Sequence, residues 1–263
     1  MNKPSEAQLS YLRKQKRTTR LIKYARLFCL CSFLFLWEIS AYLGWIDSFI
    51  FSSPSQVILC FWTMVLDRSI FLHLGITIYE TLLSFFLVTV ISLLIVILLW
   101  FSKTVSSILE PFLVVLNSLP KSALAPLLIV WLGATQTTII VAGMSVAIFG
   151  CILNLYTSFL NVDPESLKLI YTLGGNKLQA MTKIIIPSCV PSIISNMKVN
   201  IGLCLVGVII GEFLAARSGL GYLIIYSSQV FKLDWLLMSI VLLCILAMAL
   251  YSIINLLEKR YVK

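Results

Sequence analysis

Charged side chains are scarce in this sequence. Only 12% of its 263 residues are Asp, Glu, Lys or Arg, and the mean hydropathy is +1.00. Soluble domains carry roughly 25% charged residues, because their surfaces face water. The composition therefore excludes a soluble enzyme. A domain typically needs ~100–200 residues, so this chain is too short for a transport bundle plus a nucleotide-binding domain. We therefore expect a single membrane domain.

Groups that could carry chemistry are equally sparse. His73 is the single histidine, so a Ser-His triad or a histidine-built metal site lacks its parts. The seven cysteines are scattered, mostly through apolar stretches, and are interpreted as small hydrophobic side chains. No G-x-x-x-x-G-K-[ST] loop is present to hold ATP. We therefore expect no catalytic residue, no metal and no cofactor bound by this chain.

Long apolar runs dominate what is present. In lipid every backbone polar group must be satisfied internally, so such runs are helices. The sequence predicts an all-α polytopic protein with about six transmembrane helices. The expected spans cover about residues 27–46, 76–101, 108–131, 137–156, 191–215 and 235–257. Prolines at 120 and 126 should kink the third span, and a short interfacial helix is expected between the first two spans, beginning near Ser53 and Pro54.

Basic residues are distributed unevenly about these spans. Eight of the twenty Lys and Arg residues fall in residues 1–26, which we take as a basic cytoplasmic tail before a transmembrane domain at 27–263. With both termini cytoplasmic, fifteen lie inside and three, Arg68, Arg217 and Lys232, lie outside. This topology fits a multi-pass protein of the cell membrane in contact with lipid. The tail has no aromatic platform, so no nucleic-acid partner is expected.

The loop at 161–187 is the most informative segment. Asp163 and Pro164 form a typical helix start, and Gly174, Gly175 and Asn176 favour a sharp stop. Apolar residues recur at helical spacing between these two points, at Leu167, Ile170, Tyr171 and Gly174. The loop therefore predicts a short amphipathic cytoplasmic helix, Glu165–Lys177, whose stripe contacts either its own bundle or the groove of a partner.

Several motifs resemble those of the permease subunits of binding-protein-dependent ABC importers, in the nitrate/sulfonate/taurine branch. Their cytoplasmic loop has the form E-A-A, three residues, G, nine residues, I-x-L-P. Here Gly174 and Ile184-x-Ile186-Pro187 keep that spacing, whereas Lys168-Leu169-Ile170 replaces the E-A-A. Further similar stretches follow the family order, namely Ser53–Val57, Leu119–Leu127 with Trp131-x-Gly133, Gly211-Glu212-Phe213, Gly219–Ile224 and Phe231-x-x-Asp234.

The resemblance implies a transport subunit rather than an enzyme. Two permease copies would form the pathway for a small anionic organic solute, cytoplasmic ATPase subunits would bind ATP and Mg²⁺, and an extracellular or periplasmic binding protein would deliver the solute. The short cytoplasmic helix would be the coupling helix that docks on the ATPase. Its expected contact residues are Glu165, Leu167, Lys168, Ile170, Tyr171, Gly174, Gly175 and Lys177.

Four polar residues within the spans are candidates for the pathway or gate. Glu212 either lines the gate or pairs with Arg217, because intramembrane ionisable residues are functional candidates by default. Lys198, near Asn200, either faces the pathway and attracts an anionic solute or extends its ammonium group to the cytoplasmic headgroups. Lys121 lies deeper in its span, beside a proline kink, and is expected to face the pathway rather than lipid. By contrast, Gly202, Gly207 and Gly211 are expected to pack helices at a subunit interface, and Glu38 to hydrogen-bond inside the bundle.

Two other functional classes remain to be weighed. A stand-alone ion-driven secondary transporter would show inverted repeats and midplane carboxylates, and no convincing repeat is visible. A membrane-embedded enzyme would need a nucleophile, base or metal cluster. Within the importer interpretation, the solute is a sulfonate, taurine or nitrate, or alternatively a pyrimidine precursor of thiamine.

Overall fold

The computed structural model describes residues 6–47 and 51–261, which contain helices and no strand. The helices run in the order α1 (Glu6–Tyr42), α3 (Pro54–Leu66), α4 (Ser69–Phe101), α5 (Lys103–Ser118), α6 (Lys121–Leu132), α7 (Gln136–Leu160), α8 (Pro164–Thr172), α9 (Lys177–Ala180), a π-helical turn at Met181–Ile185, α10 (Ile186–Ala215), α11 (Leu220–Gln229) and α12 (Leu233–Tyr261). The all-α prediction is confirmed.

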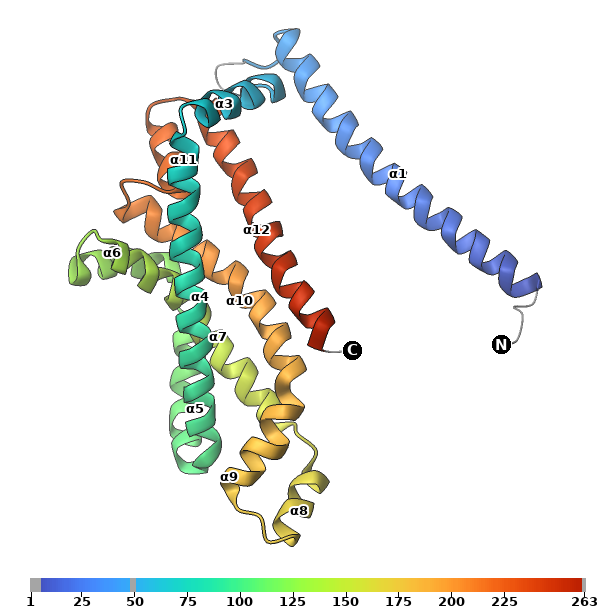
Figure 1. Ribbon diagram of the computed structural model, residues 1–263. Coiled ribbons are helices and arrows are strands. Elements are labelled where there is room, and N and C mark those ends of the chain that lie inside the picture. Colours follow the sequence, from blue (N-terminus) through green and yellow to red (C-terminus); the bar gives the residue numbers. More distant parts are fainter. Residues whose placement is uncertain (1–5, 48–50, 262–263) are drawn as a thin grey trace.

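Five helical segments in the described part of the chain are long and apolar enough to cross a membrane. They are Arg20–Tyr42, Ser69–Phe101, Gln136–Leu160, Lys177–Ala215 and Leu233–Leu256. A sixth forms if α5 and α6 count as one broken span, since the two helices meet at 97°. The prediction of about six spans is thus confirmed, but the third is a break rather than a kink. Leu119 and Pro120 are extended at that break, and α6 projects from the bundle (Figure 1).

Several helices extend beyond their predicted limits. Helix α1 starts at Glu6, so most of the basic segment before residue 27 is helical. Helix α10 is preceded without a break by the π-helical turn and α9. Together they form one 39-residue helical segment, Lys177–Ala215, which contains the predicted fifth span and the second half of the cytoplasmic loop. The side chain of Ser53 caps α3 by accepting from the Gln56 N–H, as its sequence predicts.

Two apolar clusters hold the bundle together. The first lies between α4, α7 and α10 and includes Val88, Ile152, Phe159 and Ile185. The second joins α10, α11 and α12, with α3 packed on it. Helix α1 leaves this bundle at an angle (Figure 1) and is tied to α3 through Glu38, whose carboxylate accepts from the Ser55 N–H at 3.1 Å and hydroxyl at 2.8 Å. Glu38 therefore caps a neighbouring helix at the surface and is not inside the bundle.

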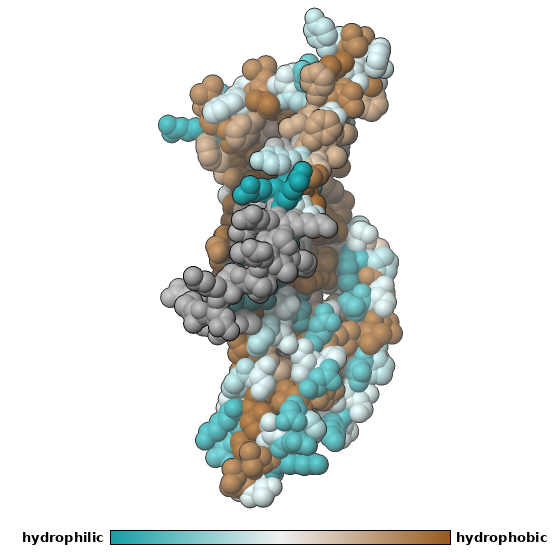
Figure 2. Space-filling view, turned by 90° about the vertical axis from the view of Figure 1, so that its right-hand side faces the viewer, coloured by the Kyte–Doolittle hydropathy of each residue, from teal (hydrophilic) through white to brown (hydrophobic). Residues whose placement is uncertain are grey.

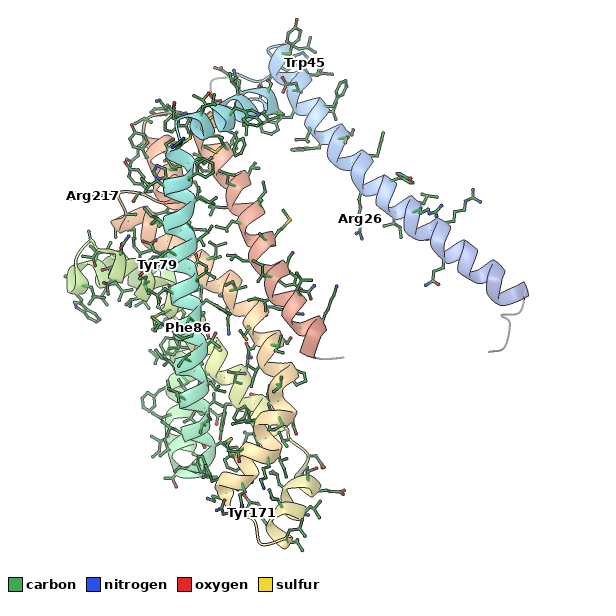
Figure 3. The ribbon with its side chains drawn as sticks, in the orientation of Figure 1. Arg26, Trp45, Tyr79, Phe86, Tyr171 and Arg217 are labelled. Carbon is green, nitrogen blue, oxygen red and sulfur yellow. The ribbon has the colours of Figure 1, made fainter. Side chains whose placement is uncertain are left out.

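The two ends of the molecule differ in character. Trp45 and α3 mark one end, and Tyr171 marks the tip of the other, beside α8 (Figure 3). We call these the α3 end and the α8 end. Near the α8 end, the face in Figure 2 carries many strongly hydrophilic side chains between apolar ones. The start of α1 and the end of α12 both lie on the α8 side of α3 (Figure 1).

Glycines bring α7 and α10 close together. A Cβ added at Gly207 would lie 2.8 Å from the Ala142 carbonyl oxygen and from the Gly143 Cα, and one at Gly211 would lie 3.0 Å from the Ile139 Cα. These glycines pack helices of the same chain, so the expected subunit interface is wrong for both. A Cβ at Gly202 would meet nothing within 4 Å.

Gly207→Ala should lower the thermal stability of the purified protein. Both Gly207 and Gly202 lie inside α10, so the gain in helix propensity is the same, and only Gly207→Ala forces α7 and α10 apart. Overpacking of this kind costs about 1–3 kcal/mol. Thermal unfolding in detergent should therefore give a lower Tm for Gly207→Ala than for Gly202→Ala. Equal Tm values would show that the helix contact is not tight.

Candidate functional site

The cytoplasmic-loop helix α8 is firmly capped at its start. The Asp163 carboxylate accepts from the N–H groups of Glu165 and Ser166, each at 3.1 Å, and from the Ser166 hydroxyl at 2.7 Å. These bonds hold the pKa of Asp163 below its ordinary value because they stabilise the carboxylate. The bond from the Ser166 hydroxyl has the largest effect on this pKa. The predicted helix start is confirmed.

The end of α8 is a tight turn. Helix α8 stops at Thr172, five residues before the predicted Lys177, and Gly174 follows with φ +81°. The Gly175 N–H donates to the Ile170 carbonyl at 2.8 Å, and a Cβ at Gly175 would lie 2.7 Å from that oxygen. Asn176 then opens α9 with a reciprocal capping box to Gln179. The loop is therefore a rigid, closed structure that feeds directly into α10.

The apolar residues of α8 face two directions. Leu167 packs against the core cluster of α4, α7 and α10, and Ile170 is half-buried. In contrast, Leu169 is 61% exposed and Leu173 is 77% exposed, one helical turn apart. Tyr171 lies at the tip of the molecule (Figure 3) and is exposed too. The predicted single stripe is thus divided between bundle and surface, and sequence reasoning missed the exposed Leu169 and Leu173 pair, which its i, i+4 spacing could have signalled.

The polar candidates of the same loop lie at the surface. The exposed ones are Glu165, Lys168, Gly174 and Lys177, while Gly175 is half-buried in the turn. Lys168 stands where the resembled motif has an acidic residue, so the exposed apolar pair of α8 is flanked by a positive charge. Such a surface fits a partner with an apolar groove and an acidic rim.

A second polar site lies near the α3 end, where Glu212 holds the start of α11. The fully buried Glu212 carboxylate accepts from the Gly221 N–H at 2.5 Å and from the Thr77 hydroxyl at 2.6 Å. The Thr77 hydroxyl oxygen accepts from the Leu220 N–H at 2.8 Å, and His73 Nδ1 accepts from the Gly219 N–H at 3.0 Å. Three orphan N–H groups of α11 are thereby satisfied from α4 and α10. We call His73, Thr77 and Glu212 the α11 cap.

The glycines of this segment are needed for that contact. A Cβ at Gly219 would overlap the Glu212 carboxyl group, and one at Gly221 would lie 2.7 Å from Glu212 Oε2. Gly219 and Gly221 are thus required because the Glu212 carboxyl group lies directly against their backbone. The alternative in which Glu212 pairs with Arg217 does not occur among the described residues.

Sequence reasoning missed three members of this region. Thr77, Glu80 and Ser84 recur at helical spacing on α4 and all are fully buried. Polar residues on one face of an apolar span are expected to face the bundle interior, which was the available signal. His73, the single histidine, accepts a hydrogen bond and stacks on Tyr222 with ring centroids 6.2 Å apart.

The remaining pathway candidates do not converge on one site. Lys198 forms an ion pair with Glu258 of α12. The Lys121 ammonium donates to the Leu116 carbonyl at the break before α6 and lies 5.1 Å from the centre of the Phe149 ring. Asn200 is buried elsewhere on α10, beside residues of α4 and α7. No group of three or more His, Cys, Asp or Glu in residues 6–47 and 51–261 is placed to hold a metal ion.

Residues 89–263, more than half of the chain, match the family described as binding-protein-dependent transport system inner membrane component. The chain belongs to this family. It is 27% identical over 228 residues to the Bacillus subtilis (strain 168) protein named as an aliphatic sulfonates transport permease, SsuC, covering 87% of this chain and 83% of that protein. The Escherichia coli (strain K12) protein of the same name is 24% identical over 243 residues, with 92% of each chain covered.

The fold agrees with this membership. The structure described as an inward-facing conformation of the MetNI methionine ABC transporter superposes with a TM-score of 0.62 over 77% of this chain and 97% of that chain, at 17% identity. The protein is accordingly a permease subunit of a binding-protein-dependent transport system, with several helices that can cross a membrane.

Thr77→Val should destabilise the permease near α11. The substitution keeps the side-chain shape and removes the hydroxyl group that serves both Glu212 and the Leu220 N–H, and leaving buried groups unsatisfied costs about 1–3 kcal/mol. Thr89→Val is the matched control, because the Thr89 hydroxyl bonds only the Phe85 carbonyl of its own helix. Hydrogen exchange of residues 219–223 should quicken in Thr77→Val alone. Equal exchange in both variants would contradict the α11 cap.

Acid should fray the start of α8 in the permease. Because folding lowers the pKa of Asp163, the ionised cap stabilises α8 fully at any pH above the ordinary Asp pKa of 3.8. This stabilisation is lost as the pH falls through the lower pKa of the folded state. Hydrogen exchange of residues 165–168, corrected for intrinsic rates, should therefore rise on acidification below about pH 4. Asp163→Asn, which caps without titrating, should remove that pH dependence, and Asp163→Ala should exchange fast throughout.

Proposed function

We propose that this permease pairs with a second copy to form the pathway of an ATP-driven importer, and that α8 is the helix on which a separate ATPase acts. The observation that carries the proposal is the exposed Leu169 and Leu173 pair, held on a capped helix at the end of the molecule opposite Trp45. Exposed apolar side chains that lie next to each other outside a membrane mark a docking surface, whereas isolated ones do not. The membership of the permease in a binding-protein-dependent family supports both partners, the ATPase and the substrate-binding protein.

The connection from α8 into the membrane supports a mechanical role. Leu167 fixes α8 to the core, and the Gly175 turn and Asn176 cap leave little slack before α9. From Lys177 the chain runs without a break to Ala215, which lies next to the α11 cap. A displacement of α8 by an ATPase would thus act on α10 directly. Rocking of such packed helices between two states is how coupled transporters change access.

The charge distribution supports a cytoplasmic position for α8. Lys168, Lys177 and Lys183 follow α8 or lie on it, and basic residues remain on the cytoplasmic side of membranes. The basic start of α1 and the basic end of α12 lie toward the same side (Figure 1). We therefore place both termini and α8 in the cytoplasm, and the α3 end on the side where a binding protein delivers solute.

The solute is proposed from the relatives. Two similar permeases carry names for aliphatic sulfonate transport, so a small sulfonate-like organic anion is the first candidate. ATP and Mg²⁺ belong to the partner in this scheme. A pyrimidine precursor of thiamine stays as the alternative solute. No observation in residues 6–47 and 51–261 favours an ion-driven transporter.

Leu169→Glu should detach the ATPase from the permease. A carboxylate at this exposed position would have to be buried in the docking contact, and loss of a central interface residue weakens binding by about tenfold or more. Tagged permease would be purified in mild detergent from its native membrane, and its partners counted by mass spectrometry. We expect one ATPase copy per wild-type permease and little or none with Leu169→Glu.

Thr182→Glu is the matched control for that experiment. It places the same charge at an exposed position of the π-helical turn, outside α8 and the Leu169 and Leu173 pair, and should keep the ATPase. Recovery of wild-type permease without any nucleotide-binding partner would overturn the importer assignment. Equal loss with both variants would indicate a general effect of charge rather than an apolar docking surface.

A further inference from the structure

Two carboxyl groups lie side by side in the interior, next to the α11 cap. Glu80 and Glu212 are both 0% exposed, and a side-chain hydrogen bond joins them. Their positions agree with this contact, because Glu80 lies one helical turn beyond Thr77 on the same face of α4, and Thr77 donates to Glu212. An ionised carboxylate can only accept, so a hydrogen bond between two carboxyl groups requires that one of them carries a proton.

The donors around the pair indicate which group carries that proton. Glu212 accepts from the Thr77 hydroxyl at 2.6 Å, from the Gly221 N–H at 2.5 Å and from the Tyr222 N–H. Hydrogen bonds of this kind stabilise the ionised form of a carboxyl group. By contrast, neither oxygen of Glu80 accepts a hydrogen bond from any donor in the described part of the chain. Glu212 is therefore the carboxylate, and Glu80 is the acid that donates to it.

A pocket of about 180 Å³ connects Glu80 with the surface of the bundle near the α3 end. Its lining includes Glu80 and Ile139, which are buried, and Gln136 and Arg217, which are exposed. Glu80 is therefore at the closed end and Arg217 at the rim, where Figure 3 shows it at the edge of its loop. At about 30 Å³ per water molecule, the pocket volume equals about six waters. A proton can thus pass between Glu80 and water at the polar rim.

Other titratable or charged groups near the pair come from α4, α11 and the loop before α11. His73 of α4 accepts from the N–H at the start of α11 and stacks on Tyr222, while Arg217 is exposed at the pocket rim. Helix α10 contributes the second carboxyl group itself, and α7 lines the pocket with Gln136 and Ile139, which do not titrate. A protonated His73 could no longer accept its hydrogen bond, so this group weakens the α11 cap in acid. Loss of the proton from the carboxyl pair acts in the opposite pH direction.

We propose that Glu80 and Glu212 form a binding site for one proton, and that this proton holds α4 against α10 and the start of α11. When the proton leaves to water in the pocket, Glu80 can no longer donate, and two carboxylates face each other in an apolar interior. Their repulsion displaces Glu212 from the N–H groups that it serves. Because the folded state binds a proton that the unfolded chain releases, the stability of this contact falls as the pH rises.

The consequence for transport rests on the proposed function, which places the α3 end on the side where solute is delivered. The pocket lies near that end, so the pH on that side sets whether the proton is bound. A bound proton keeps α11 fastened to α4 and α10. Its loss frees the start of α11 and lets this side of the permease open more readily.

Infrared spectroscopy of the purified permease, in a detergent without ester or carboxyl groups, detects the proton directly. A protonated carboxylic acid has a carbonyl stretch that is separate from the stretches of a carboxylate, and exposed carboxyl groups are ionised at neutral pH. We expect the acid band in the wild type at neutral pH and its loss as the pH rises. Glu80→Gln should remove the band, and the matched control Glu110→Gln, at an exposed glutamate of α5, should keep it.

Hydrogen exchange of residues 219–223, corrected for intrinsic rates, tests whether the proton holds α11. In the wild type, exchange should become about tenfold or more faster over the pH range in which the infrared band is lost, because a charge-assisted hydrogen bond disappears. Glu80→Gln keeps a neutral donor at the same place, so its corrected exchange should stay constant over that range. Glu110→Gln should follow the wild type, and the acid effect of His73 should persist in both variants.

Three outcomes would overturn the proposal. Absence of the acid band from the wild type at neutral pH would mean that the pair holds no proton, and this result needs no variant to fold. A band that persists in Glu80→Gln would place the proton on another group. Exchange of residues 219–223 that ignores the loss of the band, or that responds equally in Glu80→Gln, would show that the proton does not hold α11. Since only the permease is present, these results are independent of whether an ATPase is recovered.

Discussion

A carboxyl group inside the membrane domain must find its hydrogen-bond donors within the protein, and Glu212 finds them at the start of α11. The same bonds satisfy N–H groups of α11 that no water can reach. Gly219 and Gly221 follow from this contact, because any side chain there would strike Glu212. Thr77 extends the contact to α4. One buried carboxyl group thus fixes three helices in position at the α3 end of the permease.

Helix α10 joins this anchor to the opposite end of the molecule. It carries Glu212 near its last turn, and at its start it continues into α9 and the capped α8. Gly207 and Gly211 press it against α7 along the way, so it cannot shift alone. The π-helical turn at Met181–Ile185 is the one irregular stretch of this 39-residue segment. Such turns are common at functional sites, and here it lies where force from α8 would enter the bundle.

Local chemistry made much of this readable from the sequence. The apolar runs predicted the spans, and Asp163 predicted the start of α8, because a helix cap depends on adjacent backbone only. The predicted end of α8 at Lys177 was five residues late, since the helix stops at Thr172 before Gly174. The 97° break at Pro120 was not predictable, since a proline frees the backbone but packing sets the angle. The pairing of Lys198 with Glu258 joins residues 60 positions apart and needs the fold. Glu80 was hidden in an apolar run whose polar face the sequence nevertheless displayed.

The buried ionisable groups differ in how far the fold already uses them. Lys198 has its counter-charge in Glu258, and the Glu212 oxygens are used by α11, so both are already committed to the fold. Replacing either would cost stability before it touched transport, which makes uptake a poor readout for them. Glu80 differs from both, because it is fully buried beside Glu212 and neither of its carboxyl oxygens serves a backbone N–H group among the described residues. Two carboxyl groups side by side in an apolar interior repel when both are charged, so a proton shared between Glu80 and Glu212 lets the fold keep both groups.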